Sequence, residues 1–423
     1  MIDIFSTAVV LLLIFSGIYF TFKSGFVQFR ALFKKRAKKA LKNGGTSPVS
    51  AMLTALGGSI GTANIAGVAA AIAIGGPGAV FWMWISGLLG MATKYAEVTT
   101  AMRFRITDET GKKQGGIMYC ITKGLNKRLP AQLFSIFCIL GAILGGGLVQ
   151  SNTIAASAVT LHFGLPSLPF ILSAATAVLC GVTVLQGAGR IFKAATFLVP
   201  IAGGLYAIAS IAVLINGSGL IGEAFASIFK GAFGLDAAIG GGFYGMLNSM
   251  RTGMRKGTFS NEAGIGSAPI AHASVDSNDS EGQGYMGVIE VFIDTIVICT
   301  LTALVILVSG IAIPFGDTDV NGMQMAADAF SGTLGAGLAP IFLTVSIFLF
   351  AFTSIISWGL YGERAAQFLL GKRGILPYRY ALLIATALGG IVPVAFAWEV
   401  GEILNLLMAT LNIPVVLLLF KRE

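Results

Sequence analysis

The chain has 423 residues, of which 55% are hydrophobic and only 11% are charged. A water-soluble globular protein carries about 25% charged residues, so this composition excludes that class and indicates an all-α polytopic membrane protein. The net charge of +9 would, taken alone, suit a nucleic-acid partner.

The basic residues gather in alternate loops, which decides against nucleic acid. Lys23 to Lys42 carries eight of them and no acidic residue, and residues 103–128 carry seven more. This is the positive-inside pattern of cytoplasmic loops, and basic segments beside a membrane contact anionic lipid. We therefore expect a protein of the cell membrane whose basic loops meet a lipid bilayer.

Eleven apolar segments approach or exceed the length needed to cross a bilayer, about 20 residues. The basic run after the first segment places the N-terminus outside, and an odd number of spans places the C-terminus in the cytoplasm. The expected spans are residues 4–22, 49–74, 78–102, 133–155, 168–185, 191–214, 237–275, 286–313, 338–370, 380–396 and 401–420.

The second span contains an interruption at residues 56–67. Its glycines each weaken a helix by about 1 kcal/mol relative to alanine, and Ser59, Thr62 and Asn64 add polar side chains. An opened helix in hydrocarbon is tolerated only where protein or a water-filled cavity satisfies its backbone, so a polar site at membrane depth is predicted. Close helix packing through small residues is the alternative, but packing motifs do not require Thr-x-Asn beside the glycines.

A second interruption is expected at residues 255–269, which contain three glycines and a proline. Five spans start with the first broken segment, and five more start with the second after an external connection. This order predicts an inverted repeat with two discontinuous helices. The units are residues 1–47 (N-terminal helix and basic loop), 48–216 (first repeat) and 217–423 (external connection and second repeat).

Three basic residues near the expected outer end of the seventh span contradict the charge rule. They are Arg251, Arg255 and Lys256. Either this part forms an external helix before entering the membrane, which we favour, or the cations line a wide vestibule.

The breaks suit an amino acid and a small cation. A half-helix N-terminus offers amide groups to a carboxylate, and a half-helix C-terminus offers carbonyls to a cation. Thr62, Asn64, Ser260 and Asn261 are short neutral donors of oxygen, suited to a monovalent cation and a zwitterion. Because the first break has no Lys or Arg, backbone amides and a sodium ion would have to bind the carboxylate.

Polar residues in two other spans leave alternatives open. The adjacent hydroxyls of Thr353 and Ser354 could serve one ion, although Ser and Thr in such helices usually bond back to their own helix, which these residues alone favour. Gln150 could reach a ligand amine or bond to another helix. Trp358 could wall a small pocket or simply pack.

Ionisable residues inside spans are costly and indicate function. Lys94 and Glu97 lie three apart and are expected to pair as a structural or gating pair. Glu290 and Asp294 lie four apart on one helix face, where ion coupling, proton coupling and a buried network all remain open. Asn64 of the first break is a further candidate for coupling.

Six motifs have a common match: Gly-Ser-Ile-Gly-Thr-Ala-Asn-Ile-Ala-Gly at 58–67, Gly-Gly-Pro-Gly-Ala at 75–79, Met-Ala-Thr-Lys-Tyr-Ala-Glu at 91–97, Gly-Gly-Ile-Met-Tyr at 115–119, Phe-Ser-Asn-Glu-Ala-Gly-Ile-Gly-Ser-Ala-Pro at 259–269 and Tyr-Gly-Glu-Arg at 361–364. Over nearly the whole chain they resemble the alanine or glycine:cation symporter family. The resemblance implies a leucine-transporter-type five-plus-five inverted repeat with one extra helix in front. It also implies sodium-driven uptake of a small neutral amino acid, L-alanine or glycine and sometimes the D-isomer.

The resemblance also implies site residues. Sodium would be held by the carbonyls of Gly57, Ile60 and Phe350 and the hydroxyls of Thr353 and Ser354. Substrate would lie between Gly61, Thr62 and Ala63 on one side and Phe259, Ser260 and Asn261 on the other, with Gln150 and Trp358 closing the pocket. The family often has glycine where Ala63 stands, which leaves alanine against glycine open.

The predicted function is therefore that of a secondary transporter, without a nucleotide-binding loop to act as a motor. A proton-coupled transporter with Glu290 or Asp294 as carrier is the nearest alternative, and an ion channel is a more distant one. No enzyme is expected, because the sequence offers neither a Ser/His/Asp set nor metal-spaced His and Glu residues.

Overall fold

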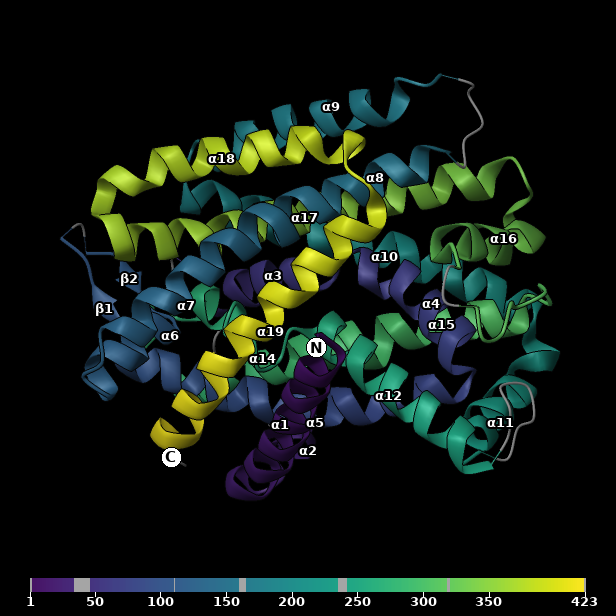
Figure 1. Cartoon of the computed structure of the whole chain (residues 1–423), viewed down its shortest axis with the longest axis horizontal. Coiled ribbons are helices and arrows are strands. Elements are labelled where there is room, and N and C mark those ends of the chain that lie inside the picture. Colours follow the sequence, from purple (N-terminus) through teal and green to yellow (C-terminus); the bar gives the residue numbers. More distant parts are fainter. Residues whose placement is uncertain are drawn as a thin grey trace.

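The computed structural model describes residues 2–33, 46–109, 111–159, 165–234, 242–317 and 320–421, and these are almost entirely helical (Figure 1). Most of the basic run expected in the first cytoplasmic loop lies outside the described residues, as does the start of the seventh expected span. Two short strands, β1 (Ile106–Thr107) and β2 (Lys113–Gln114), pair antiparallel in the basic loop that follows the third expected span.

The described α-helices, in chain order, are α1 (Ile2–Ser24), α2 (Val27–Phe33), α3 (Pro48–Ser59), α4 (Ala66–Gly75), α5 (Gly78–Phe104), α6 (Ile117–Tyr119), α7 (Leu129–Leu140), α8 (Gln150–Val159), α9 (Leu168–Val184), α10 (Ala188–Asn216), α11 (Ile221–Ala232), α12 (Gly242–Asn261), α13 (Ala268–His272), α14 (Ser280–Val291), α15 (Thr300–Val308), α16 (Gly322–Leu334), α17 (Leu338–Leu370), α18 (Ile375–Leu388) and α19 (Val394–Leu419). Short 3₁₀ turns cover Thr62–Asn64, Ser218–Leu220, Gly371–Gly374 and Gly389–Ile391, and π-helical segments cover Cys120–Gly124, Gly141–Val149 and Phe292–Cys299.

Helix α17 runs through the middle of the molecule, with α18 and α9 along one edge and α5, α12 and α14 toward the opposite edge (Figure 1). Every residue of α17 from 350 to 366 is buried. A helix that is buried on all sides must lie inside a larger helical assembly. The outer helices instead expose large apolar side chains, such as Val178, Ile208 and Leu418 at about 70%. Such surfaces suit acyl chains rather than water.

Six helical stretches of the described residues are long and apolar enough to cross a bilayer: Phe5–Ser24, Leu129–Ser157, Ala188–Asn216, Ser280–Val308, Leu338–Ile391 and Trp398–Leu419. The stretch Leu338–Ile391 contains both α17 and α18. The multi-pass, all-helical class is thus confirmed. The count of eleven spans and the inverted repeat remain predictions.

The first expected helix break is present. Helix α3 ends at Ser59, Ile60 and Gly61 are extended, and α4 begins only at Ala66 after a 3₁₀ turn. The backbone of this break is buried, so its free amides and carbonyls must find partners within the protein.

The second break is shorter than expected. Helix α12 continues through Asn261, and the chain is non-helical only from 262 to 267 before α13 begins. Glu262, Gly264 and Gly266 have φ of 51°, 90° and 84° in this turn, a left-handed backbone that glycine adopts without strain. The helix persists before it because a Cβ at Gly257 would lie only 2.8 Å from the Ser86 Cβ of α5. This close helix packing outweighs the low helix propensity of glycine.

The three unexpected basic residues do not form a separate external helix. Arg251, Arg255 and Lys256 all belong to α12, the helix that leads into the second break. Arg255 pairs with Glu402 of α19. The expectation of a distinct external helix for these residues is therefore wrong, because one continuous helix carries them to membrane depth.

Candidate ion and substrate site

The carbonyl end of α3 meets α17 at Ser354. The Ser354 hydroxyl lies 3.0 Å from the Gly57 carbonyl oxygen, 3.3 Å from that of Gly58 and 3.4 Å from that of Ile60, and all these residues are buried. A hydroxyl donates one hydrogen bond, so it cannot satisfy three carbonyls. Surplus acceptors in a dry place are what a small hard cation requires.

The remaining residues of the expected ion site lie on the same turn of α17. Thr353 Oγ1 donates to the Phe350 carbonyl at 2.9 Å, so in this structure it bonds back to its own helix. A Cβ at Gly57 would lie 3.3 Å from the Thr353 Cβ and 3.2 Å from Ser357 Oγ, which shows how closely α3 approaches α17 here. Ser357 Oγ is buried without a hydrogen-bond partner. The five expected ligands therefore meet where the two helices cross.

Gly61 brings the expected substrate residues next to these carbonyls. A Cβ at this position would lie 3.1 Å from Ser354 Oγ and 3.2 Å from Gln150 Oε1. The amide of Thr62 points to Gln150 Oε1 at 3.5 Å, and the Thr62 hydroxyl is buried without a partner. An unpaired buried hydroxyl costs free energy unless a ligand engages it. Ala63, on the same turn, is partly exposed.

Asn64 joins the two breaks. Its Oδ1 accepts from the Gly61 amide at 2.9 Å, and its Nδ2 lies 3.1 Å from Ser260 Oγ and 2.8 Å from Asp294 Oδ1. Ser260 Oγ in turn donates to Asp294 Oδ2 at 2.9 Å. Asp294 lies in the π-helical segment Phe292–Cys299, and such segments often mark functional sites. A carboxylate and neutral oxygens thus converge in a fully buried place.

The expected pairing of Lys94 with Glu97 is wrong. Lys94 Nζ lies 3.1 Å from Glu290 Oε1 and donates to the Glu262 carbonyl at 3.3 Å. Glu290 Oε2 also lies 2.8 Å from His272 Nε2, and both partners are fully buried. Helix α14 packs along α5 and brings Glu290 to Lys94, and a partner on a neighbouring helix can approach head-on where one on the same helix cannot.

Glu97 holds the second break instead. Its Oε2 accepts from the Gly264 amide at 3.1 Å, and its Oε1 accepts from the Asn412 side chain of α19. Asn412 also donates to the Gly264 carbonyl at 2.8 Å. The left-handed turn at Gly264 is thereby fixed from α5 and from α19.

Glu262 is a site residue that the sequence analysis did not single out. Its Oε1 accepts from the Trp358 indole at 2.9 Å, and its Oε2 accepts from the Ser267 hydroxyl at 2.8 Å. The Trp358 ring lies against Gly141 and Gly146, where a Cβ would meet it. An acidic residue inside a broken span is itself a functional signal, which would have identified Glu262.

The structure brings Ser260 to the first break but directs its two neighbours elsewhere. Phe259 contacts Trp398 of α19, with ring centroids 5.7 Å apart. Asn261 Oδ1 accepts from the Ala263 amide, and its Nδ2, which has no partner, faces Gly90 of α5. The placement of Phe259 and Asn261 against substrate therefore stays a prediction without a supporting contact.

Comparisons with known proteins agree with this arrangement. Residues 2–423 match the model of the sodium:alanine symporter family. The sodium/alanine symporter AgcS of Methanococcus maripaludis is 36% identical over 420 residues, which cover 96% of this chain and 90% of that protein. The amino-acid carrier protein AlsT of Bacillus subtilis is 34% identical over 412 residues, covering 96% of this chain and 86% of AlsT.

A solved structure shares the fold. The crystal structure of MhsT in complex with L-phenylalanine aligns with a TM-score of 0.59 and 14% identity over 87% of each chain. This likeness concerns the fold alone. Together with the family match over the whole chain, it shows that the chain belongs to the sodium:alanine symporter family, a family of sodium-coupled amino-acid transporters of the membrane rather than of enzymes.

Proposed function

We propose that this chain is a symporter that takes up a small neutral amino acid, alanine or glycine, together with sodium. The observation that carries the proposal is the meeting of Gly61, Gln150 and the Ser354 hydroxyl beside three surplus carbonyls of α3. One side of this point suits a cation, and the other suits a zwitterion.

Sodium would bind between α3 and α17. The carbonyls of Gly57 and Ile60 and the hydroxyl of Ser354 already converge, while Thr353 would have to turn its hydroxyl away from the Phe350 carbonyl to join them. Ser354 is therefore the stronger ligand candidate of the two hydroxyls.

The amino acid would bind at Gly61. The Thr62 amide and the sodium ion would hold its carboxylate, since a half-helix N-terminus favours an anion. Gln150 Oε1 would accept from its ammonium group. Because a Cβ at Gly61 would already crowd Ser354 and Gln150, the space suits only a small side chain. Trp358, fixed by its bond to Glu262, would wall the site.

A proton could replace or accompany the sodium ion at Asp294. The hydrogen-bond partners of this buried carboxylate, Asn64, Ser260 and Thr295, are neutral. A buried carboxylate without a cationic partner favours a bound cation or a proton. Glu290 is a poorer carrier, because Lys94 and His272 already engage it.

Alternating access would be built on the two discontinuous helix pairs, α3–α4 and α12–α13. In this proposal residues 48–216 and 217–423 form the inverted repeats, α1 precedes them, and eleven spans leave the N-terminus outside and the C-terminus in the cytoplasm. Thr62 and Asn64 are fully buried, which argues against a channel open to both sides. Anionic lipid would meet the basic cytoplasmic loops.

Uptake by the purified full-length chain in liposomes tests this proposal. An inward sodium gradient should drive saturable alanine accumulation that a proton ionophore does not abolish, and titration calorimetry should show tighter alanine binding with sodium than without it. Accumulation on a proton gradient alone would assign coupling to a proton. Sodium flux that is independent of amino acid and does not saturate would overturn symport in favour of a channel.

A further inference from the structure

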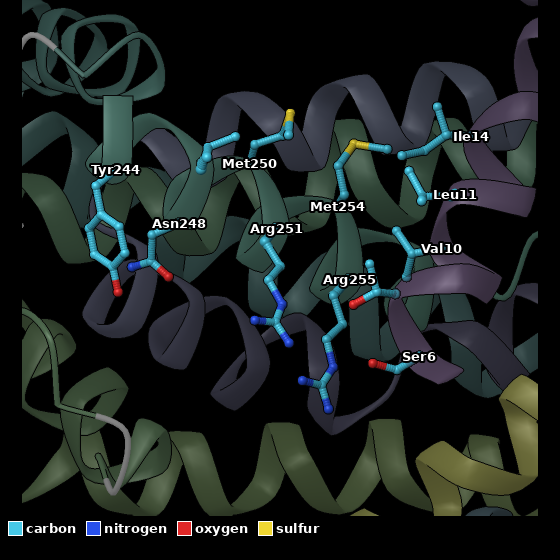
Figure 2. Close-up of a pocket in the computed structure, with 12 residues that line it drawn as sticks. Ser6, Val10, Leu11, Ile14, Tyr244, Asn248, Met250, Arg251, Met254 and Arg255 are labelled. Carbon is cyan, nitrogen blue, oxygen red and sulfur yellow. The ribbon is translucent and has the colours of Figure 1, made fainter. Parts of the chain in front are cut away.

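A cavity of about 370 Å³ lies between α1 and α12, away from the residues proposed for sodium and amino acid (Figure 2). Its wall is mainly apolar along both helices, and two arginines of α12 line it as well. The wall residues that carry the following argument are Val10, Leu11, Met250, Met254, Arg251 and Arg255.

The cavity lies on a surface that faces lipid. Leu11 of α1 is 60% exposed, and Tyr244 and Leu247 of α12 are 76% and 38% exposed, although all three line the cavity. Large apolar side chains exposed on a membrane-spanning flank contact acyl chains. An apolar space of this kind does not hold water, because water needs several polar partners.

Arg251 gives the cavity a polar end. Figure 2 shows the Arg251 and Arg255 side chains extending from α12 in the same direction, with Val10 and Leu11 of α1 reaching toward α12 beside them. Glu402 offsets the charge of Arg255, whereas Arg251 is exposed at the cavity. Basic residues on the outer part of a span contradict the charge rule, so their presence calls for an anionic partner.

We propose that this cavity binds an anionic phospholipid. One acyl chain would lie between Val10 and Leu11 of α1 and Met250 and Met254 of α12, and the phosphate would be bound by Arg251. Guanidinium groups bind phosphate through two parallel hydrogen bonds, which fits Arg251 to this role. The assignment to the outer leaflet rests on the orientation proposed above, but the lipid site itself does not.

The site has a consequence for α1. This helix precedes the ten helices of the proposed repeats, and along the cavity its contact with α12 is incomplete. A bound acyl chain completes that contact through dispersion and apolar burial. Since α12 ends at Ser260 and Asn261, the lipid supports the helix that carries the second break.

Native mass spectrometry of the purified full-length chain, incubated with phosphatidylglycerol or phosphatidylcholine, tests the site. The wild type should retain one tightly bound phosphatidylglycerol and prefer it to phosphatidylcholine by about fivefold, the factor that one basic residue contributes near an anionic surface. Arg251→Gln should abolish the preference while still binding either lipid. Val10→Trp, which fills the cavity, should reduce retention of both.

Two variants serve as matched controls. Lys230→Gln removes an exposed cation of α11, and Val178→Trp enlarges a lipid-facing residue of α9, and neither residue lines the cavity. Both should retain phosphatidylglycerol as the wild type does. An unchanged lipid preference in Arg251→Gln, or unchanged retention in Val10→Trp, would overturn the proposal. Sodium-driven alanine uptake, measured on the same samples, reports separately on the proposed transport function.

Discussion

The two helix breaks of this transporter are held by different chemistry. Neutral groups stabilise the first break, where the Gly61 amide is bound by Asn64 and the α3 carbonyls face Ser354. Charged groups stabilise the second, where Glu97 binds the Gly264 amide and Lys94 binds the Glu262 carbonyl. A neutral break leaves backbone groups available to a ligand, whereas a charged network keeps a turn in one shape. The comparison suggests that the first break binds and the second positions.

The largest expected effect comes from removing the cation of the second break. Lys94→Met keeps the side-chain length but leaves Glu290 buried without its ion-pair partner, which costs about 3–5 kcal/mol of unfolding free energy. The thermal unfolding midpoint of the purified protein should fall accordingly. If neutral residues could hold the second break equally well, the midpoint would not move.

The exposed pair of Lys372 and Glu109 supplies the control. The Glu109 carboxylate raises the pKa of Lys372 through a hydrogen bond and through its charge, but solvent surrounds both groups. Lys372→Met should therefore leave the unfolding midpoint unchanged. Equal shifts in the two variants would show that burial of the Lys94 pair has no special importance.

An intermediate effect is expected at the first break. Gly61→Val would force a branched side chain against Ser354 and Gln150, and overpacking of this kind costs about 1–3 kcal/mol. Alanine binding measured by calorimetry should weaken at least about tenfold, while the protein still inserts and folds. Gly203→Val in α10, where a Cβ meets no atom within 4 Å, should keep wild-type binding. Wild-type affinity in Gly61→Val would contradict a backbone site.

The smallest effect separates two neighbouring hydroxyls. Ser354→Ala should raise the sodium concentration for half-maximal uptake by about tenfold, since a contact with a charged group contributes about 1.5 kcal/mol. Thr353→Ala should also raise it, but less, because its hydroxyl is bound to the Phe350 carbonyl. Both should change the preference for alanine over glycine little. Sodium dependence that is unchanged in both variants would remove α17 from the ion site.

Local sequence signals predicted the first break well and the second only in part. Glycines beside Thr62 and Asn64 are a local signal, and α3 ends where they begin. At the second break, packing of Gly257 against α5 keeps the helix intact through Asn261, and helix propensity alone does not contain that contact.

The electrostatic partners were the least predictable feature. Spacing along one helix suggested Lys94 with Glu97, but the actual partner of Lys94 is Glu290 on another helix. Only the packing of α14 against α5 decides this, and that packing is set by residues far apart in sequence. Glu262 was missed for a different reason: it lay inside a motif that was interpreted for its glycines.

The amide of Asn64 has one accepting end and one donating end, and these serve opposite sides of the protein. An arriving carboxylate that captured the Gly61 N–H would leave the accepting end without its bond and free the amide to rotate. Rotation would withdraw the donor from Ser260 and Asp294 in the same movement. A single planar group would in this way report occupancy of the pocket to the distant half of the fold, without any shift of a helix being required first.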